Sequence, residues 1–389
     1  MPGPAQFEER IRRRIRELEQ AGLRRTLHPP AGIDLSSNDY LGLANHPRIK
    51  QRMAEAVLEE GCGSTASRLL RGERPSLSAV ERRFAAFKNA EASLYFGSGY
   101  AANLSVLATF PDRHDTVFTD EQNHASIVDG IRLSRAQRVK FRHRDIDHVA
   151  RLLRSAPEGS QRFLVTESLF SMDGDFAPLE SYAELCRETR TVLIVDEAHA
   201  TGIYGRTGSG WIEHTRSGSE VFLSVDTAGK ALGVAGAFVS GPAWARDYLI
   251  QRARPFMFST APPPAMAAAL DASLSVIADE PERRHRLREL SLMLRTMLCE
   301  RGIRIGGSES QIIPIVLGDN ESTQAAAAEL QREGFDVRAI RPPAVAPGTA
   351  RLRVSVNSQL DEAVLRRFAA VVHRVMQVMR VTSCSAVSS

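Results

Sequence analysis

The sequence has few cysteines and no long uninterrupted hydrophobic run. Its cysteines, Cys62, Cys186, Cys299 and Cys384, lack the spacing of a metal or redox site, so we expect reduced thiols with structural roles. No apolar stretch is long enough to span a membrane, and the first residues lack a signal-peptide pattern. These absences favour a cytoplasmic protein without a membrane segment or a metal site.

The composition is that of a globular protein. The 389 residues are 43% hydrophobic and 25% charged, enough for a large core and more than one domain. The formal net charge is only +4, and the segment "FEERIRRRIRELEQAGLRR" interleaves Glu with Arg at helical spacing. This pattern is typical of a solvated helix face. No aromatic platform or zinc pattern accompanies it, so we expect no nucleic-acid partner.

The order of apolar runs and helical patterns predicts an α/β fold. Six short runs between about residues 80 and 280 are strand candidates, and most lack polar alternation, as in strands covered on both faces. Helical segments lie between them, which predicts a mostly parallel sheet. We therefore expect an N-terminal helix and arm over 1–45, a large α/β domain over 46–280, a smaller α+β domain over 281–380 and a flexible tail over 381–389.

Polar residues directly follow four of the predicted strands. These ends are "FGSGYAAN", "TESLFSMDG", "DEAHATGIYG" and "DTAGK". In open α/β sheets ligands gather beyond the carboxyl ends of the strands. Asp196 and His199 leave one such strand together; a helix-capping Asp and a core His are the plain alternatives. The Gly97–Gly99 turn matches a dinucleotide fingerprint only loosely, and "DTAGKAL" does not have P-loop spacing.

Lysine is unusually rare in this arginine-rich chain. Only Lys50, Lys88, Lys140 and Lys230 are present, and Lys230 stands among small residues in "DTAGKALG". Arginine cannot deprotonate at ordinary pH, so a retained lysine can indicate a need for an amine. A lysine, a phosphate-accepting turn and a strand-end carboxylate together are the parts that pyridoxal 5'-phosphate requires.

These segments resemble the α-oxoamine synthase family of pyridoxal-phosphate enzymes. The resemblance runs from "DLSSNDYLGLA" through "GSTASRLLRG", "NHASIVDG", "VDEAHATGIYGRTGSG" and "TAGKALG" to "RPPAVAPGTARLRVSVN". It implies the fold-type I, aspartate aminotransferase-like architecture. It also implies a homodimer with a shared active site.

The resemblance also implies roles for individual residues. Lys230 would carry the cofactor and move the α-proton of the substrate, Asp196 would pair with the pyridine nitrogen, and His124 would stack on the ring. Glu167 would orient the substrate site. The other implied cofactor contacts are Ser98, Gly99, Tyr100, Ser168, His199, Thr227 and, from the neighbouring subunit, Ser259 and Thr260.

Four further positions concern the substrate. Arg353 matches the arginine that binds the amino-acid carboxylate. Arg24 resembles the residue that meets the acyl substrate, although a surface helix charge is an alternative nearly as strong. Ala344 stands where the family usually has a hydroxyl residue, and Ala66 where Gly is common. Neither change removes a catalytic group.

Within the family, "SQIIPIVLGDN" and "AIRPPAVAPGTARLRVS" favour members that condense L-alanine with a pimeloyl thioester in biotin synthesis. The acyl carrier, coenzyme A or a carrier protein, is left open. Glycine C-acetyltransferase, 5-aminolevulinate synthase, serine palmitoyltransferase and quorum-signal synthases are the alternatives, since one methyl group is worth only about 1–3 kcal/mol in a pocket. A nicotinamide-dependent oxidoreductase is the alternative from another class.

Overall fold

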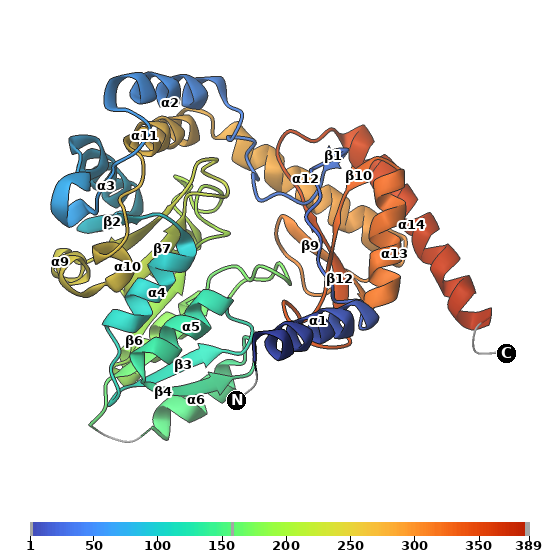
Figure 1. The fold of residues 1–389 in the computed structure, drawn as a ribbon, viewed down its shortest axis with the longest axis horizontal. Helices are drawn as coiled ribbons and strands as arrows, with labels where there is room; N and C mark the ends of the chain where they lie inside the picture. Colours follow the sequence, from blue (N-terminus) through green and yellow to red (C-terminus); the bar gives the residue numbers. More distant parts are fainter. Residues whose placement is uncertain (1–2, 157–158, 386–389) are drawn as a thin grey trace. The chain divides into compact units, whose positions relative to one another are not determined.

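The computed structural model describes residues 3–156 and 159–385. This chain divides into two compact units (Figure 1). The larger unit contains residues 38–171 and 175–287, and the smaller contains 1–37, 172–174 and 288–389.

The larger unit is built on a seven-stranded sheet with the order β2-β8-β7-β6-β5-β3-β4. Only β8 runs antiparallel to its neighbours, so the sheet is mostly parallel, as predicted. The strands are β2 (Ala92–Phe96), β3 (Thr116–Asp120), β4 (Gln137–Phe141), β5 (Arg162–Glu167), β6 (Val192–Asp196), β7 (Val221–Thr227) and β8 (Ala237–Gly241).

Six of these strands agree with the six predicted runs, and β4 is the one that the sequence analysis missed. Four of the five residues of β4, "QRVK", are exposed or only partly buried, so this edge strand has no apolar run to reveal it. The edge position explains this composition, because an edge strand pairs with a neighbour along one side only and leaves its other side open to water.

Apolar residues on both faces of the central strands hold the sheet between two layers of helices. In β5, Phe163 and Val165 join one buried cluster and Leu164 joins the other. Because successive side chains of a strand point to opposite faces, this alternation shows that both faces are covered. One layer contains α4 (Gly99–Thr109), α5 (Ala125–Ser134), α9 (Ala243–Arg252) and α10 (Arg254–Met257), and the other contains α6 (Ile146–Arg154) and α7 (Leu179–Thr189).

The remaining helices of the larger unit contact both one another and the elements above; α3 also packs on β2 and β8, and α8 on α7. Helix α11 packs against α2 and α3. The bounds are α2 (Pro47–Glu60), the π-helical turn η1 (Arg68–Gly72), α3 (Pro75–Lys88), α8 (Trp211–Thr215) and α11 (Pro264–Asp279).

The smaller unit has the predicted α+β composition. Its antiparallel sheet has the order β11-β12-β9, and β1 pairs with β10 in parallel. The strands are β1 (Ile33–Asp34), β9 (Ile312–Gly318), β10 (Phe335–Asp336), β11 (Arg338–Ile340) and β12 (Ala350–Ser355). The helices are α1 (Pro4–Gln20), α12 (Glu282–Glu300), which crosses the boundary between the units at residue 288, α13 (Asn320–Arg332) and α14 (Glu362–Ser385).

Both ends of the chain bear on sequence predictions. Helix α1 buries none of its residues, and Arg12 and Arg16 pair with Glu8 and Glu9 at its surface, as expected for a solvated face. Helix α14 continues to Ser385, so the expected tail begins within a helix, and residues 386–389 lie outside the described chain. Among the described residues, we find no helix that could cross a membrane.

Candidate active site

Most of the predicted cofactor residues gather at one edge of the seven-stranded sheet, whereas Ser259 and Thr260 follow α10. Strands β2, β5, β6 and β7 run in the same direction, so their carboxyl ends share that edge. Glu167, Asp196 and Thr227 are the last residues of β5, β6 and β7, and Ser98 follows β2. The parallel topology therefore brings together side chains that are far apart in the sequence.

Lys230 lies in the loop between β7 and β8 and contacts His199. Its Nζ atom is 2.8 Å from Nε2 of His199, and Nδ1 of that ring is 2.7 Å from the hydroxyl oxygen of Tyr40. The Tyr40 hydroxyl donates its proton to Oδ1 of Asn38 at 2.9 Å, so its oxygen accepts from His199. The neutral ring then carries its proton on Nδ1, and Nε2 accepts from Lys230.

Asp196 is a buried carboxylate held by two neutral donors. Its side chain is 6% exposed. The backbone N–H of Ala198 donates to Oδ1 at 2.8 Å, and the amide of Asn103 donates to Oδ2 at 2.6 Å. Neither donor is charged, so these hydrogen bonds fix the carboxylate without neutralising it. Such a group is suited to a cationic N–H.

The start of α4 forms a tight turn against β7. Ser98 caps this helix by accepting a hydrogen bond from the N–H of Ala101. A Cβ atom on Gly99 would lie only 2.4 Å from Oγ1 of Thr227, so a glycine is required for this approach. Tyr100 is partly exposed and donates its hydroxyl proton to Asp129. Free N–H groups at a helix start, with nearby hydroxyls, are typical of a phosphate site.

Glu167 ties the segment that carries His124 to the end of β5. The backbone N–H of His124 donates to Oε1 of Glu167 at 2.7 Å. Burial, with the charge of Asp196 second, raises the pKa of Glu167 to about 8. Burial lowers the pKa of His124. The charge of Asp196 opposes this shift, and the charge of Lys230 adds to it. Ser168 is buried, and its N–H donates to the carbonyl of Asp196 at 2.8 Å.

A buried ion-pair cluster lies beside the end of β6, which bears Asp196, and beside β7, which leads to Lys230. Nζ of Lys88 lies 2.9 Å from Oε2 of Glu197 and 2.8 Å from Oδ1 of Asp226, and both carboxylates are fully buried. Thr201 and Ser224 also donate to Asp226. Burial raises the pKa of Glu197, although the charge of Lys88 opposes this. The cluster thus joins the residue after Asp196 to the strand that leads to Lys230.

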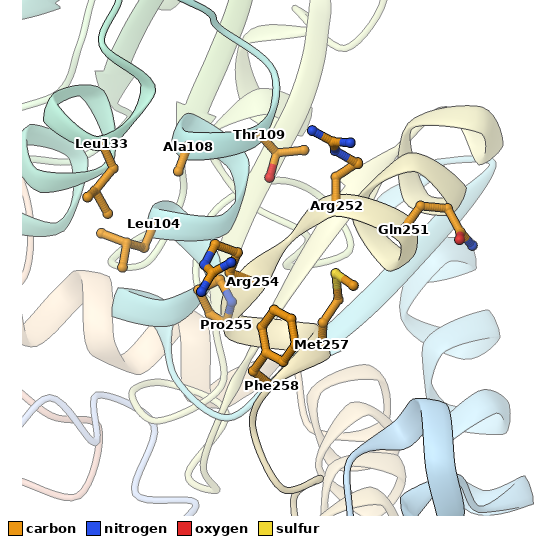
Figure 2. A pocket seen from close by; sticks show the side chains of 10 residues that line it. All are labelled: Leu104, Ala108, Thr109, Leu133, Gln251, Arg252, Arg254, Pro255, Met257 and Phe258. Atoms are coloured by element: carbon orange, nitrogen blue, oxygen red, sulfur yellow. The ribbon is translucent and has the colours of Figure 1, made fainter.

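Ser259 and Thr260 are exposed and follow α10. A pocket of about 590 Å³ lies beside this segment, between the second half of α4 and α10, and the ring of Phe258 faces it (Figure 2). Its described lining includes Arg252 and Arg254 but none of the predicted cofactor residues.

The substrate candidates belong to the smaller unit. Arg24 is exposed and pairs with Glu19 at 2.8 Å, and Ala344 is exposed in the loop after β11. Arg353 is buried on β12 and donates to Oγ of Ser355 at 2.8 Å.

Several residues of the site were not found from the sequence. Tyr40, Asn103 and the cluster around Lys88 acquire their roles only through contacts across many residues. Asn103 left one signal, because it is a polar residue that, like Ser105, lies among the buried apolar residues of α4. Lys88 ends α3 and is indistinguishable from a surface charge in the sequence.

The residues fit a pyridoxal-phosphate site. The tight Gly99–Thr227 approach suits a phosphate, the buried Asp196 suits a protonated pyridine, and Lys230 supplies a partly buried amine. In the described residues no group of His, Cys, Asp and Glu has the arrangement of a metal site.

Known proteins resemble this chain over almost its whole length. An 8-amino-7-oxononanoate synthase from Anaeromyxobacter dehalogenans is 45% identical over 376 residues, which cover 93% of this chain and 94% of that protein. One from Geobacter sulfurreducens is 42% identical over 377 residues, covering 93% and 96%.

Two solved structures show a similar fold. A serine palmitoyltransferase from S. paucimobilis, with bound PLP–myriocin aldimine, has a TM-score of 0.91 and 25% identity, covering 98% of this chain and all of that one. An 8-amino-7-oxononanoate synthase from Francisella tularensis has a TM-score of 0.78 and 27% identity, covering 90% and 99%.

The sequence profile of a family described as aminotransferase class I and II matches residues 30–372. Together with the relatives above, this match identifies a fold-type I enzyme whose cofactor is pyridoxal 5'-phosphate. The chain belongs to the aminotransferase class I and II family.

Proposed function

We propose that this enzyme condenses L-alanine with a pimeloyl thioester to give 8-amino-7-oxononanoate, carbon dioxide and the free thiol carrier. The new carbon–carbon bond forms between the α-carbon of alanine and the thioester carbonyl, and the thiol leaves. The alanine carboxyl group is then lost as carbon dioxide. The product is a precursor in biotin synthesis.

One observation carries the reaction class: the contact of Lys230 with His199 at the strand edge that also bears Asp196. The choice of substrates rests on the relatives, since proteins 42–45% identical over 93% of this chain are named 8-amino-7-oxononanoate synthases. The serine palmitoyltransferase neighbours are similar in fold at only 25% identity.

When bound, pyridoxal phosphate supplies an aldehyde that captures amines and a ring that stabilises negative charge on the captured amino acid. Lys230 would hold this group through Nζ, and its freed amine would take the proton from the α-carbon of alanine. Asp196 would keep the ring nitrogen protonated. Gly99, Ser98 and Thr227 would bind the phosphate, and His199 would hydrogen-bond the ring hydroxyl.

Other residues would orient the substrates. His124 would stack on the cofactor ring near the reacting atoms. Glu167 would hold His124 in place by accepting its backbone N–H at 2.7 Å. Arg353 would grip the alanine carboxylate with its fork of N–H donors, a task that lysine performs poorly. Arg24 would meet the acyl chain.

The enzyme would act as a homodimer. Ser259 and Thr260 are exposed, and in the proposed dimer they would reach the phosphate site of the neighbouring subunit. The exposed ring of Phe258 and the adjacent pocket support a partner surface at this segment. The carrier of the pimeloyl group would be coenzyme A or an acyl carrier protein.

The decisive assay offers alanine, glycine and serine, each with pimeloyl, acetyl, succinyl and palmitoyl thioesters. We expect the amino ketone from alanine and pimeloyl thioester to form with the highest kcat/KM. Turnover of serine with palmitoyl thioester, or of glycine with acetyl thioester, in preference to that pair would overturn the choice of substrates and leave the reaction class intact.

A second measurement tests the reaction class itself. The isolated, cofactor-supplemented protein should be yellow, and borohydride should remove the visible band by fixing the cofactor to the protein. A nicotinamide-dependent oxidoreductase would lack this band. A colourless protein that retains no pyridoxal phosphate contradicts the proposal.

A further inference from the structure

His143 lies between two carboxylates in the larger unit. It follows β4, and its Nδ1 is 3.0 Å from Oδ1 of Asp120 while its Nε2 is 3.0 Å from Oδ2 of Asp175. The two carboxylates are almost completely buried. The ring of Phe170 packs edge-on against the imidazole, with 4.4 Å between ring centroids.

This geometry sets the protonation state of the ring. A neutral imidazole has a single N–H, so it can donate to only one of the two carboxylates. Only the imidazolium form donates from both nitrogens. Burial opposes that charge, but the hydrogen bonds and charges of Asp120 and Asp175 outweigh it and raise the pKa of His143 to about 9.

Asp120 controls the turn that leads to His124. Its Oδ1 accepts the N–H of Gln122 at 2.9 Å, and its carbonyl accepts the N–H of Asn123 at 3.2 Å. The Asn123 side chain then bonds to Val165 and to the N–H of Glu167. His124 is the next residue, and its N–H donates to Glu167. The position of Asp120 is therefore transmitted to His124 over four residues.

Asp175 controls the segment that follows β5 and begins with Ser168. The carbonyl of Asp175 accepts the N–H of Phe170 at 3.0 Å, and the carbonyl of Ser168 accepts the N–H of Ala177 at 3.0 Å. Leu169 and Phe176 form a bridge between the two sides of this segment. Ser168 is in turn bonded to the carbonyl of Asp196.

We propose that His143, as an imidazolium, is a positioning residue that fixes the His124 turn and the Ser168 segment to each other, and so holds the cofactor site in shape. This role deepens the proposed function and rests on it for the assignment of His124 and Ser168 to the cofactor. Loss of the proton from His143 breaks one of the two hydrogen bonds and leaves a buried carboxylate without that donor.

Other charged groups surround His143 and its two carboxylate partners. Oδ2 of Asp175 also accepts from Nη1 of Arg144 at 2.9 Å, and Oδ2 of Asp120 accepts the backbone N–H of Arg144 at 3.0 Å. The backbone N–H of His143 donates to Oε1 of Glu121 at 3.1 Å. Further titratable groups of the adjoining elements include Arg142, Asp145, Tyr182 and His148, whose Nδ1 accepts the backbone N–H of Arg142 at 3.0 Å. Because a guanidinium group does not deprotonate in proteins, the Arg144 hydrogen bonds persist at high pH, and one of the two His143 hydrogen bonds is lost there.

The sign of the pH dependence follows from the raised pKa. The folded state binds this proton more tightly than the unfolded chain, so the contribution is complete below about pH 6.5 and is lost as the pH rises through about 9. Cofactor affinity should therefore decline on the alkaline side, with the midpoint of the His143 titration.

The test follows the His143 ring by NMR and the dissociation constant of pyridoxal phosphate by fluorescence, from pH 6 to 10.5. We expect a wild-type ring midpoint near 9 and weaker cofactor binding above it. His143→Gln should bind the cofactor roughly ten- to a hundredfold more weakly at pH 7.5, because charge-assisted hydrogen bonds are lost. It should also lose the alkaline inflection. His143→Arg, which keeps a cation, should recover part of the affinity and also lose the inflection.

The matched control is His114→Gln, which changes an exposed histidine and should leave both readouts unchanged. Should His143→Gln fail to fold, Asp175→Asn replaces it: removal of one carboxylate should lower the midpoint of the ring clearly below the wild-type value. A wild-type ring midpoint below pH 8, or a midpoint unmoved in Asp175→Asn, overturns the proposal. So does wild-type cofactor affinity in His143→Gln. None of these readouts uses a thioester, so a failure to form the amino ketone would count against the proposed function alone.

Discussion

Lys230 donates to His199 across 2.8 Å, and the same imidazole donates from its other nitrogen to Tyr40. The lysine amine is thus held at one end of a hydrogen-bonded chain that continues to Asn38. In this arrangement Nε2 of His199 accepts a hydrogen bond from the lysine amine and fixes its position.

Replacement of Lys230 by alanine should prevent covalent attachment of the cofactor and lower kcat by at least about 10²–10⁴-fold, the usual contribution of a positioned base. Borohydride reduction followed by peptide mass spectrometry should find the cofactor on the Lys230 peptide of the wild type and on none in the variant. Lys140→Ala, at an exposed lysine of β4, is the control and should behave as wild type. Full activity of Lys230→Ala would contradict the proposed role.

Gly99→Ala should weaken cofactor binding. The added Cβ would lie 2.4 Å from Oγ1 of Thr227, so either the Thr227 side chain or the start of α4 must shift. Overpacking of about 1–3 kcal/mol corresponds to roughly 5- to 150-fold in the dissociation constant of pyridoxal phosphate. Gly97→Ala is the matched control, since a Cβ there meets nothing within 4 Å. Equal affinities of the two variants would show that the approach at Gly99 is not needed.

Lys88→Met should lower the free energy of unfolding by about 3–5 kcal/mol, because it leaves Glu197 and Asp226 buried without their cation. The double variant Lys88→Met/Glu197→Gln should recover part of this loss, since one carboxylate is then neutral. Chemical denaturation of the cofactor-free proteins measures both. Lys50→Met, at an exposed position, should change stability by less than about 0.5 kcal/mol. A loss that small for Lys88→Met would argue against a buried ion pair.

Cys186 should resist alkylation in the folded protein. Burial, with the charge of Glu220 second, raises its pKa to about 12, so almost no thiolate exists at pH 8. Cys62 and Cys299 are exposed and should react. Iodoacetamide labelling with peptide mapping, before and after unfolding in urea, compares the three sites. Labelling of Cys186 at the rate of Cys62 in the native state would rule out this burial.

The central part of the fold was predictable because its strands are buried on both faces. A run such as "VLIVD" cannot be a surface helix or a loop, and it appears as β6. Strand β4 was not predictable in the same way, because its residues "QRVK" contact water and carry no apolar run. The strand exists because β3 offers it a complete row of backbone partners.

Candidate residues such as Asp196 and Lys230 were predictable because each stands directly after an apolar run. Partners such as Tyr40 and Asn103 were not, since a hydrogen bond between residues 40 and 199 leaves no local pattern in either segment. The same holds for His143, whose two carboxylates come from positions 23 and 32 residues away.

Residue order alone was enough to predict the alternation of strands and helices, the polar strand ends and the cofactor class, because burial and backbone geometry act locally on short segments. Tertiary structure decided which charges became buried pairs. Lys88 and His143 look like ordinary polar residues along the chain, and they become structural cations only because folding removes water from the carboxylates beside them.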